Sequence, residues 1–376
     1  MPSIFRSNGI RDTDYNTDED TIKKLRDNWQ AHIPEIKPYH GNFKDRGIVI
    51  CAGGLRYFTC SWITVKMLRR LGCNLPIEIW YMGNELSDEI IQAFSTLGVS
   101  CRNFMEGGPV SLSGFMLKPL SIIQSSFREV LFLDADNMCV KNPDTLFSMP
   151  QYLEHGAVFW PDYWRTAPTN PIWEIIDSNK FDIQEQESGQ ILIDKEKCWE
   201  ALNLAMYFNT QSDHYYQMLY GDKDTFKFAW IALNKPFHMI QQQVGTCGYI
   251  AADKRFYGTT MVQHAPDNTF LFLHRNLIKW DVTLPGEKTW HIIKRFYPNA
   301  ANKEYQIDYS NNSHFFVDLK GDVEILDFRE MLGDYEQTCL DDLHSLRKTD
   351  MFNRFVTYSH FATYRYIRSE HFTLSH

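Results

Sequence analysis

The stretch VLFLDADNMCVKNP, residues 130–143, joins an apolar run to two acidic residues. Val130–Leu133 predict a buried strand, and Asp134 and Asp136 follow at its end. Two carboxylates one residue apart beyond a strand end can both turn toward one hard cation, because Mg²⁺ and Mn²⁺ prefer oxygen ligands. The same spacing also suits an Asx turn that only begins the next segment. Spacing alone leaves both interpretations open.

Strands and helices alternate in the residues that precede this stretch. Strands are expected at 47–54, 76–83 and 99–104, and helices at 56–72, 87–98 and 113–127. Three strand–helix units that lead into a fourth strand predict an α/β fold with a Rossmann-like, mostly parallel central sheet flanked by helices. Such a sheet binds its ligand at the carboxyl ends of its strands. The glycine turn at 52–54 and the two aspartates both follow strand ends, so we expect them at one ligand-facing edge.

The second half of the chain continues this pattern less regularly. We expect a strand that runs into an aromatic loop at 156–164, further strands at 188–194, 237–241 and 314–320, and helices at 195–209, 222–234 and 334–364. Residues 1–45 are interpreted as an N-terminal arm with a helix over 18–32. Because the alternation fades beyond residue 280, we predict a central α/β domain at 46–280, with its first half ending near 145, and a C-terminal extension at 281–376.

Composition restricts the class of protein. The 376 residues are 44% hydrophobic and 23% charged, which is typical of a globular chain. With 38 basic and 47 acidic residues, the net charge of -9 argues against a nucleic-acid-binding protein. The eight cysteines form no CxxC pair, so we expect reduced thiols. We find no signal peptide and no run of about 18 apolar residues, and expect a soluble, cytoplasmic protein unless an N-terminal anchor has been removed.

Polar residues near these predicted elements are candidates for a site. Lys118 could neutralise a phosphate or be a solvated lysine. The segment WPDYW, residues 160–164, offers rings that stack on sugar faces and a carboxylate that accepts from hydroxyls, or it is a packed loop. Asp222 suits a helix N-cap and Asp224 the first helical turn, an interpretation that explains the first aspartate better than the second.

Two histidines and the segment ESGQ, residues 187–190, complete the set of candidates. Glu187 and Gln190 could flank a turn that precedes a strand. A histidine at the end of an apolar strand, His274 or His264, could complete an octahedral cation site begun by the aspartates, although a single strand-end histidine is more often structural.

In order, the segments of residues 46–280 resemble the fungal Golgi α-mannosyltransferases that add α-1,2- or α-1,3-linked mannose to mannan and glycoprotein glycans. The resemblance rests on GIVICAGG, NLPIEIWYMG, SGFMLKPLSIIQSSFREVLFLDADNMCVKNPDTLF, FWPDYW, ESGQILIDK, GDKDTF and VGTCGY. It implies a GT-A glycosyltransferase fold, a GDP-mannose donor, a divalent cation (Mn²⁺ or Mg²⁺) and retention of the anomeric configuration. Family members are type II membrane proteins, so a chain that had lost its anchor would act in the Golgi lumen.

The resemblance also implies roles for individual residues. The metal ligands would be Asp134, Asp136 and His274, with His264 as the alternative histidine. The donor would contact Ala52, Gly53, Tyr57, Lys118, Asp134, Gln190 and Lys223. The catalytic carboxylates would be Asp224, Asp222 and Glu187, and the acceptor would contact Trp160, Asp162 and Tyr163.

Alternatives remain open for the mechanism and for the function. In a retaining transfer, a carboxylate could form a covalent glycosyl intermediate, or the acceptor could attack from the face that the diphosphate leaves. We favour same-face attack onto a glycan hydroxyl acceptor, with Asp224 supporting the oxocarbenium-like sugar. UDP-glucose, UDP-galactose and UDP-xylose are the alternative donors. A catalytically silent carbohydrate-binding protein is the alternative to an enzyme.

Overall fold

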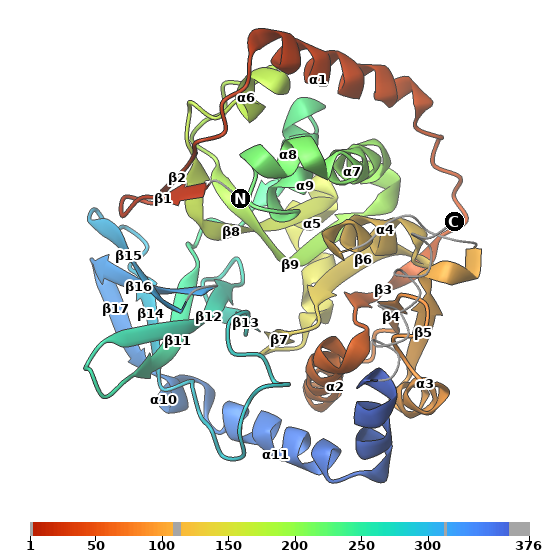
Figure 1. Ribbon diagram of the computed structural model, residues 1–376, viewed down its shortest axis with the longest axis vertical. Helices are drawn as coiled ribbons and strands as arrows, with labels where there is room; N and C mark the ends of the chain where they lie inside the picture. Colours follow the sequence, from red (N-terminus) through yellow and green to blue (C-terminus); the bar gives the residue numbers. More distant parts are fainter. Residues whose placement is uncertain (1–2, 108–113, 312–313, 361–376) are drawn as a thin grey trace, which may run out of the picture.

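The computed structural model describes residues 3–107, 114–311 and 314–360, and it has helices on both faces of a large mixed β-sheet (Figure 1). In spatial order, its strands are β1 (Ser3–Phe5), β2 (Ile10–Thr13), β8 (Ala157–Thr166), β9 (Gln184–Asp194), β6 (Phe127–Asp134), β3 (Lys44–Cys51), β4 (Ile77–Tyr81) and β5 (Val99–Asn103), and β10 (His238–Met239) pairs with β8. Strands β6, β3, β4 and β5 are parallel, whereas β9 is antiparallel to both of its neighbours. The predicted α/β architecture with a mostly parallel central sheet is confirmed.

A second sheet and a hairpin lie beside the first sheet. The second sheet contains, in spatial order, β17 (Val323–Asp327), β14 (Ile292–Phe296), β11 (Gly245–Ile250), β12 (Phe256–His264), β13 (Phe270–His274) and β7 (Asn137–Cys139), and the hairpin pairs β15 (Lys303–Asn311) with β16 (His314–Gly321). The short strand β7 follows β6 after only two residues. The chain therefore passes from the first sheet to the second at the Asp134 and Asp136 segment.

The helices follow the predicted alternation in the first half of the chain. They are α1 (Glu19–His32), α2 (Gly54–Arg70), α3 (Asp88–Ser95), α4 (Leu117–Gln124), α5 (Pro150–His155), α6 (Ile172–Ile175), α7 (Lys195–Thr210), α8 (Ser212–Met218), α9 (Lys223–Ala232), α10 (Phe328–Leu332) and α11 (Tyr335–Arg347). Asp18 caps α1 by accepting from the Thr21 amide at 2.7 Å, and Ser87 caps α3. Such side-chain caps satisfy amides that have no partner inside the helix.

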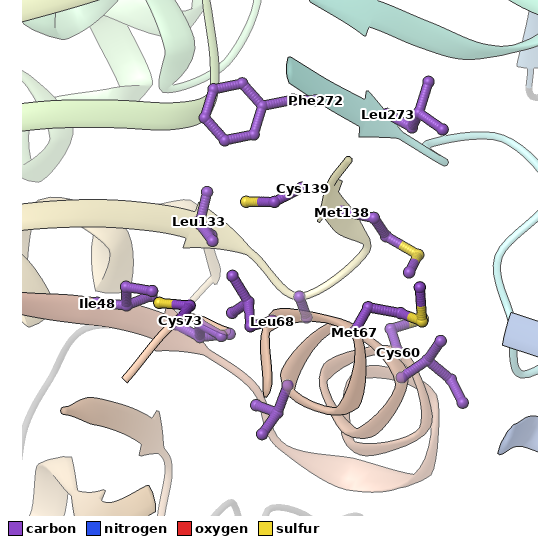
Figure 2. Packing of buried hydrophobic residues seen from close by; sticks show 14 of the residues in the cluster. Ile48, Cys60, Met67, Leu68, Cys73, Leu133, Met138, Cys139, Phe272 and Leu273 are labelled. Carbon is purple, nitrogen blue, oxygen red and sulfur yellow. The ribbon is translucent and has the colours of Figure 1, made fainter. Parts of the chain in front are cut away.

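Strand β6 shows why this sheet is covered on both faces. Leu131 and Leu133 pack in one hydrophobic cluster with α2 and α3, whereas Val130 and Phe132 pack in another with α4 and α7. Successive side chains of a strand point to opposite faces, so a continuous apolar run is buried only between two helical layers. Figure 2 shows part of the first cluster, in which Leu133 and the α2 side chains share a core with Phe272 of β13.

Two predicted local structures in the second half are wrong. Residues 160–164 continue strand β8 and form no loop, and β9 begins at Gln184, so ESGQ lies inside a strand. The two strands pair with each other, with Trp160 opposite Glu187, and the register shifts between Pro161 and Arg165. A shift of this kind accommodates a proline inside a strand, and it cannot be seen without the partner strand.

The N-terminal and C-terminal segments each add strands to one of the two sheets. The hairpin β1–β2 extends the large sheet beyond β8, and β14 and β17 belong to the same sheet as β11–β13. The predicted boundary at residue 280 therefore passes through one sheet. The helix predicted at 334–364 is interrupted, because α11 ends at Arg347 and helical residues resume only at 350; the end of this prediction falls beyond the described residues. The eight cysteines are free thiols, and none of the described helices is long and apolar enough to cross a bilayer.

Candidate functional site

The two aspartates lie where the two sheets meet. Asp134 is the last residue of β6 and pairs in register with Cys51 at the end of β3. His274 is the last residue of β13 and pairs with Asn137 of β7, while the backbone amide of Arg275 donates to the Asp136 carbonyl at 3.0 Å. Strand pairing thus brings the His274 imidazole close to two carboxylates that lie far from it in sequence.

The distances among these groups suit a cation. His274 Nε2 lies 3.4 Å from Asp136 Oδ1 and 3.8 Å from Asp134 Oδ2, and His274 Nδ1 lies 3.1 Å from Glu187 Oε1. One ligand atom each of Asp134, Glu187 and His274 lie within 4.8 Å of one another. Because Nδ1 faces Glu187, Nε2 is the nitrogen that is directed at both aspartates. The candidate cation group of the described residues is therefore Asp134, Glu187 and His274, and the predicted ligand Asp136 lies beside it, 3.4 Å from His274 Nε2.

Burial and neighbouring charges have opposite effects on the pKa values of His274 and Asp136. Burial opposes the charge of His274, but Asp136 and Glu187 outweigh it and raise the pKa of His274 to about 10. Burial raises the pKa of Asp134, whereas Lys279 and His274 overcome burial at Asp136 and lower the pKa of that carboxyl. Carboxylate oxygens and an imidazole nitrogen are ligands that fit a divalent ion such as Mn²⁺.

Two lysines neutralise the aspartates. Lys118, at the start of α4, lies 3.0 Å from Asp134 Oδ1 and 3.1 Å from Asp222 Oδ2 and donates to Ser188 Oγ at 2.8 Å. It is buried, so the interpretation as a solvated lysine is wrong. Lys279, which follows His274 by five residues, contacts Asp136 Oδ2. We did not predict Lys279 from the sequence; its only signal there is its position just past an apolar strand with a terminal histidine.

Asp222 has a different role from the one its position suggested. It is the N-cap residue of α9, but its side chain makes no capping hydrogen bond. The carboxylate turns instead toward Lys118 and accepts from Ser188 Oγ at 3.3 Å. The N-cap interpretation of this side chain is therefore wrong. Asp222 joins the surroundings of the cation site.

A second group of charged residues, which we call the charge network, is contributed by β2, β8, β9 and α9. Its members are Arg11, Asp162, Glu185, Lys223, Asp224 and Lys227, all of which are buried. Lys223 Nζ lies 2.6 Å from Glu185, 2.7 Å from Asp224 and 3.0 Å from Asp162. Asp224, with no exposed surface, also pairs with Lys227 at 3.0 Å and accepts from the Gln186 amide. Three cations balance three anions, which is what burial of so many charges requires.

A small cavity of about 150 Å³ connects the two groups of charges. Its lining includes Asp162, Tyr163 and Trp164 of β8, Glu187 of β9, Lys223, Thr260 and Asn276, together with Phe315 and Val317 of the C-terminal hairpin. Burial raises the pKa of Asp162 to about 6, although Lys223 opposes this shift. The cavity presents carboxylates, an ammonium and aromatic rings, which is the chemistry that recognises a sugar ring.

The other predicted residues lie either near the start of α2 or in the buried interior. Ala52, Gly53 and Tyr57 lie at the β3–α2 turn, and the Tyr57 side chain is 43% exposed. Trp160 is fully buried and its indole donates to the His264 carbonyl, so it faces the core and not the cavity. His264 lies in that core and is absent from the candidate ligand group. Gln190 is also buried and accepts from Asn137 at 2.6 Å.

Replacing Gly189 with alanine should disrupt the cation site. A Cβ at this position would lie 2.6 Å from His274 Nδ1 and 2.8 Å from Glu187 Oε1, closer than real contacts allow. Displacement of the imidazole should weaken Mn²⁺ binding by about 10–100-fold, the usual loss when a ligand loses its orienting partner. Titration calorimetry with Mn²⁺ measures this, and a melting curve of the same variant tests that it folds. Unchanged Mn²⁺ affinity would contradict the site.

The fold and the site together define an α/β protein with a candidate divalent-cation centre at a strand edge and a small polar and aromatic cavity beside it. The chain belongs to the family described as "Mannosyltransferase putative", whose model matches residues 45–185 and 176–265. Because this match covers more than half of the chain, the predicted family is confirmed.

The chain is similar to several curated fungal proteins. Alpha-1,2-mannosyltransferase MNN24 of Candida albicans is 29% identical over 294 residues, 65% of this chain and 41% of that protein. Alpha-1,2-mannosyltransferase MNN5 of Saccharomyces cerevisiae is 27% identical over 58% of this chain and 48% of that protein. Alpha-1,2-mannosyltransferase MNN2 of Candida albicans is 22% identical over 77% of this chain and 60% of that protein. This chain thus spans between two fifths and three fifths of these relatives.

Solved structures align more weakly. The galactosyltransferase LgtC aligns with a TM-score of 0.36 and 12% identity over 51% of this chain and 72% of that chain. The glycosyltransferase GlyE of Streptococcus pneumoniae aligns with a TM-score of 0.35 and 13% identity over 52% of this chain and 45% of that chain. Scores of this size carry no argument, and the α/β assignment rests on the sheet order.

Proposed function

We propose that this protein is a metal-dependent retaining α-mannosyltransferase of the GT-A type that moves mannose from GDP-mannose to a glycan hydroxyl. The convergence of Asp134, Asp136 and His274 at a strand edge, in a chain of the mannosyltransferase family, supports this proposal most directly. Ligands bind at such edges of α/β sheets.

Asp134, Asp136 and His274 would hold the divalent cation, Mn²⁺ or Mg²⁺. When bound, the cation supplies Lewis-acid stabilisation of the departing diphosphate, so no proton donor is needed at that oxygen. Lys118 and Lys279 already contact the two aspartates and supply further positive charge for the phosphate oxygens. Glu187 keeps the His274 ring in place through Nδ1.

The cavity beside Glu187 is where we place the transferred sugar. Asp162 and Glu187 line it and would orient sugar hydroxyls, while Lys223 balances their charge. Asp224 has no exposed surface, so in this proposal it acts by holding Lys223 and not by touching the sugar. We favour attack by the acceptor hydroxyl from the face that the diphosphate leaves, with the leaving phosphate taking the acceptor proton.

GDP with Mn²⁺ should stabilise the protein more than UDP with Mn²⁺. A ligand present at 100 times its Kd adds about 2.7 kcal/mol to the free energy of unfolding, enough for a clear rise in melting temperature. Thermal-shift measurements with both nucleotides test the donor base, and nucleotide release from GDP-mannose, UDP-glucose, UDP-galactose and UDP-xylose with methyl α-mannoside tests turnover. Stabilisation by UDP alone would overturn the GDP-mannose donor, and binding without turnover would favour the silent carbohydrate-binding alternative.

A further inference from the structure

A carboxylate that no predicted role uses lies against the glycine turn after β3. An added Cβ at Gly53 would be 1.9 Å from Glu85 Oε2 and 2.5 Å from its Cδ. The space that a side chain at Gly53 would fill is thus occupied by the Glu85 carboxylate, which comes from the loop after β4. With φ of -137°, the Gly53 backbone could carry other residues, so close approach is the feature that favours glycine here.

The loop that carries Glu85 is fixed on both sides. The Gly54 amide donates to the Glu85 carbonyl at 3.0 Å, which ties the loop to the start of α2. On the other side, the Gly83 amide donates to Asn103 Oδ1 at 2.9 Å, and Asn103 Nδ2 donates to the Gly83 carbonyl at 2.8 Å. The carboxylate is therefore held at the edge formed by β3, β4 and β5 before any ligand binds, which reduces the entropy lost on binding.

Glu85 keeps hydrogen-bonding capacity in this position. Its Oε2 accepts from the Met82 amide at 2.9 Å, a short turn-closing bond. Among the described residues, Oε1 has no hydrogen-bond partner, and the side chain is exposed at the carboxyl edge of the sheet. A carboxylate has about four acceptor positions, so a single backbone amide leaves most of them for a ligand.

Glu85 follows β4 and Asp134 ends β6, and β3 lies between these two strands in the sheet. Cys51, at the end of β3, is in register with Asp134, and the Gly53 turn follows it directly. The exposed Tyr57 ring, on the first turn of α2, lies 5.9 Å from Lys279 Nζ, the amine that contacts Asp136. A diphosphate near Asp136 would therefore have the Tyr57 ring beside it for stacking a base. The fixed Glu85 carboxylate lies against the start of α2, the helix that carries this ring.

We propose that Glu85 accepts hydrogen bonds from the N–H groups of the donor nucleobase and thereby selects guanine. Guanine presents two adjacent donors, N1–H and the 2-amino group, which match the two oxygens of one carboxylate. Uracil presents one N–H between two carbonyl oxygens, so a carboxylate gains one bond and meets two repulsive acceptors. A site built to satisfy polar groups rejects analogues that lack them. This inference rests on the proposed function, whose nucleotide it specifies.

Nucleotide binding to Glu85→Gln tests this assignment without turnover. Calorimetry with Mn²⁺ compares GDP, UDP and inosine diphosphate, which lacks the 2-amino group. We expect the wild type to bind GDP at least about 10-fold more tightly than inosine diphosphate, the factor that one charged hydrogen bond provides. The Glu85→Gln variant should lose most of this preference, because an amide NH₂ opposes a base donor. Glu106→Gln, which changes an exposed glutamate in the helical turn after β5, is the control and should bind as the wild type does.

Each outcome separates the inference from the proposed function. Equal binding of all three nucleotides by wild type and Glu85→Gln would overturn the role of Glu85 even if GDP-mannose is the donor. Wild-type binding of UDP and not GDP would overturn both the GDP donor and the selection of guanine. Wild-type preference for GDP over inosine diphosphate that persists in Glu85→Gln would leave the donor intact and overturn this inference alone.

Discussion

Replacement of Asp136 with alanine should lower Mn²⁺-dependent transfer from GDP-mannose by at least about 100-fold, because preorganised charge stabilisation of a leaving group contributes that much or more. The carboxylate lies 3.4 Å from His274 Nε2 and contacts Lys279, so its loss removes a proposed ligand oxygen and takes from the half-buried Lys279 its carboxylate partner. Release of GDP from GDP-mannose in the presence of methyl α-mannoside measures the effect. Turnover equal to that of the wild type would contradict the metal role of Asp136.

Controls separate chemistry from folding in this experiment. Asp341→Ala removes an exposed aspartate on α11 and should leave turnover unchanged. The double variant Asp136→Asn, Lys279→Met removes both partners of one ion pair, so it should recover stability relative to Asp136→Ala without recovering turnover. If the double variant recovers turnover, the loss in Asp136→Ala is a folding defect and not the loss of a metal ligand.

Replacement of Glu336 with alanine should lower the free energy of unfolding by about 3–5 kcal/mol, the usual cost of leaving a buried charge unpaired. Glu336 lies on α11 and its Oε1 is 3.1 Å from Nη1 of the fully buried Arg275. It also accepts from the backbone amides of Thr289 and Trp290 at 2.9 and 3.1 Å. The substitution would therefore leave the Arg275 guanidinium and two backbone amides without this carboxylate partner.

The same variant should also affect the cation site. Arg275 directly follows His274, and its amide donates to the Asp136 carbonyl. Urea unfolding measures the stability change, and Mn²⁺ titration of the folded variant measures the effect on the site. Glu330→Ala on α10, where the side chain is exposed, is the matched control and should change stability by less than about 0.5 kcal/mol. A change below about 1 kcal/mol for Glu336→Ala would show that α11 is not anchored through this ion pair.

The sequence predicted well those features that depend on local pattern. The apolar run 130–133 predicted a buried strand, and this is confirmed, because a strand between two helical layers must be apolar on both faces. The helix predicted over 18–32 is confirmed as α1, in which Asp18 is the N-cap residue. The roles carried over by resemblance at Asp134, Asp136 and His274 remain predictions that their geometry supports.

Other residues could not be assigned in this way. Trp160 and Tyr163 belong to one aromatic segment, yet only Tyr163 lines the cavity, because the register of β8 against β9 directs Trp160 into the core. The sequence around Lys118 also suits a solvated lysine, whereas in the structure its ammonium pairs with Asp134 and Asp222. Burial and pairing of a long side chain depend on partners that are distant in sequence, and periodicity carries no information about them.

The sequence by itself determined the α/β alternation and the acidic end of β6, since hydrophobic periodicity and strand termination are properties of neighbouring residues. Only the tertiary structure decided which distant groups meet there: His274 from β13, Lys279 beyond it, and Glu85 in the space beside Gly53. The physical reason is that strand pairing and register, which join segments more than a hundred residues apart, set the distances on which coordination and charge balance depend.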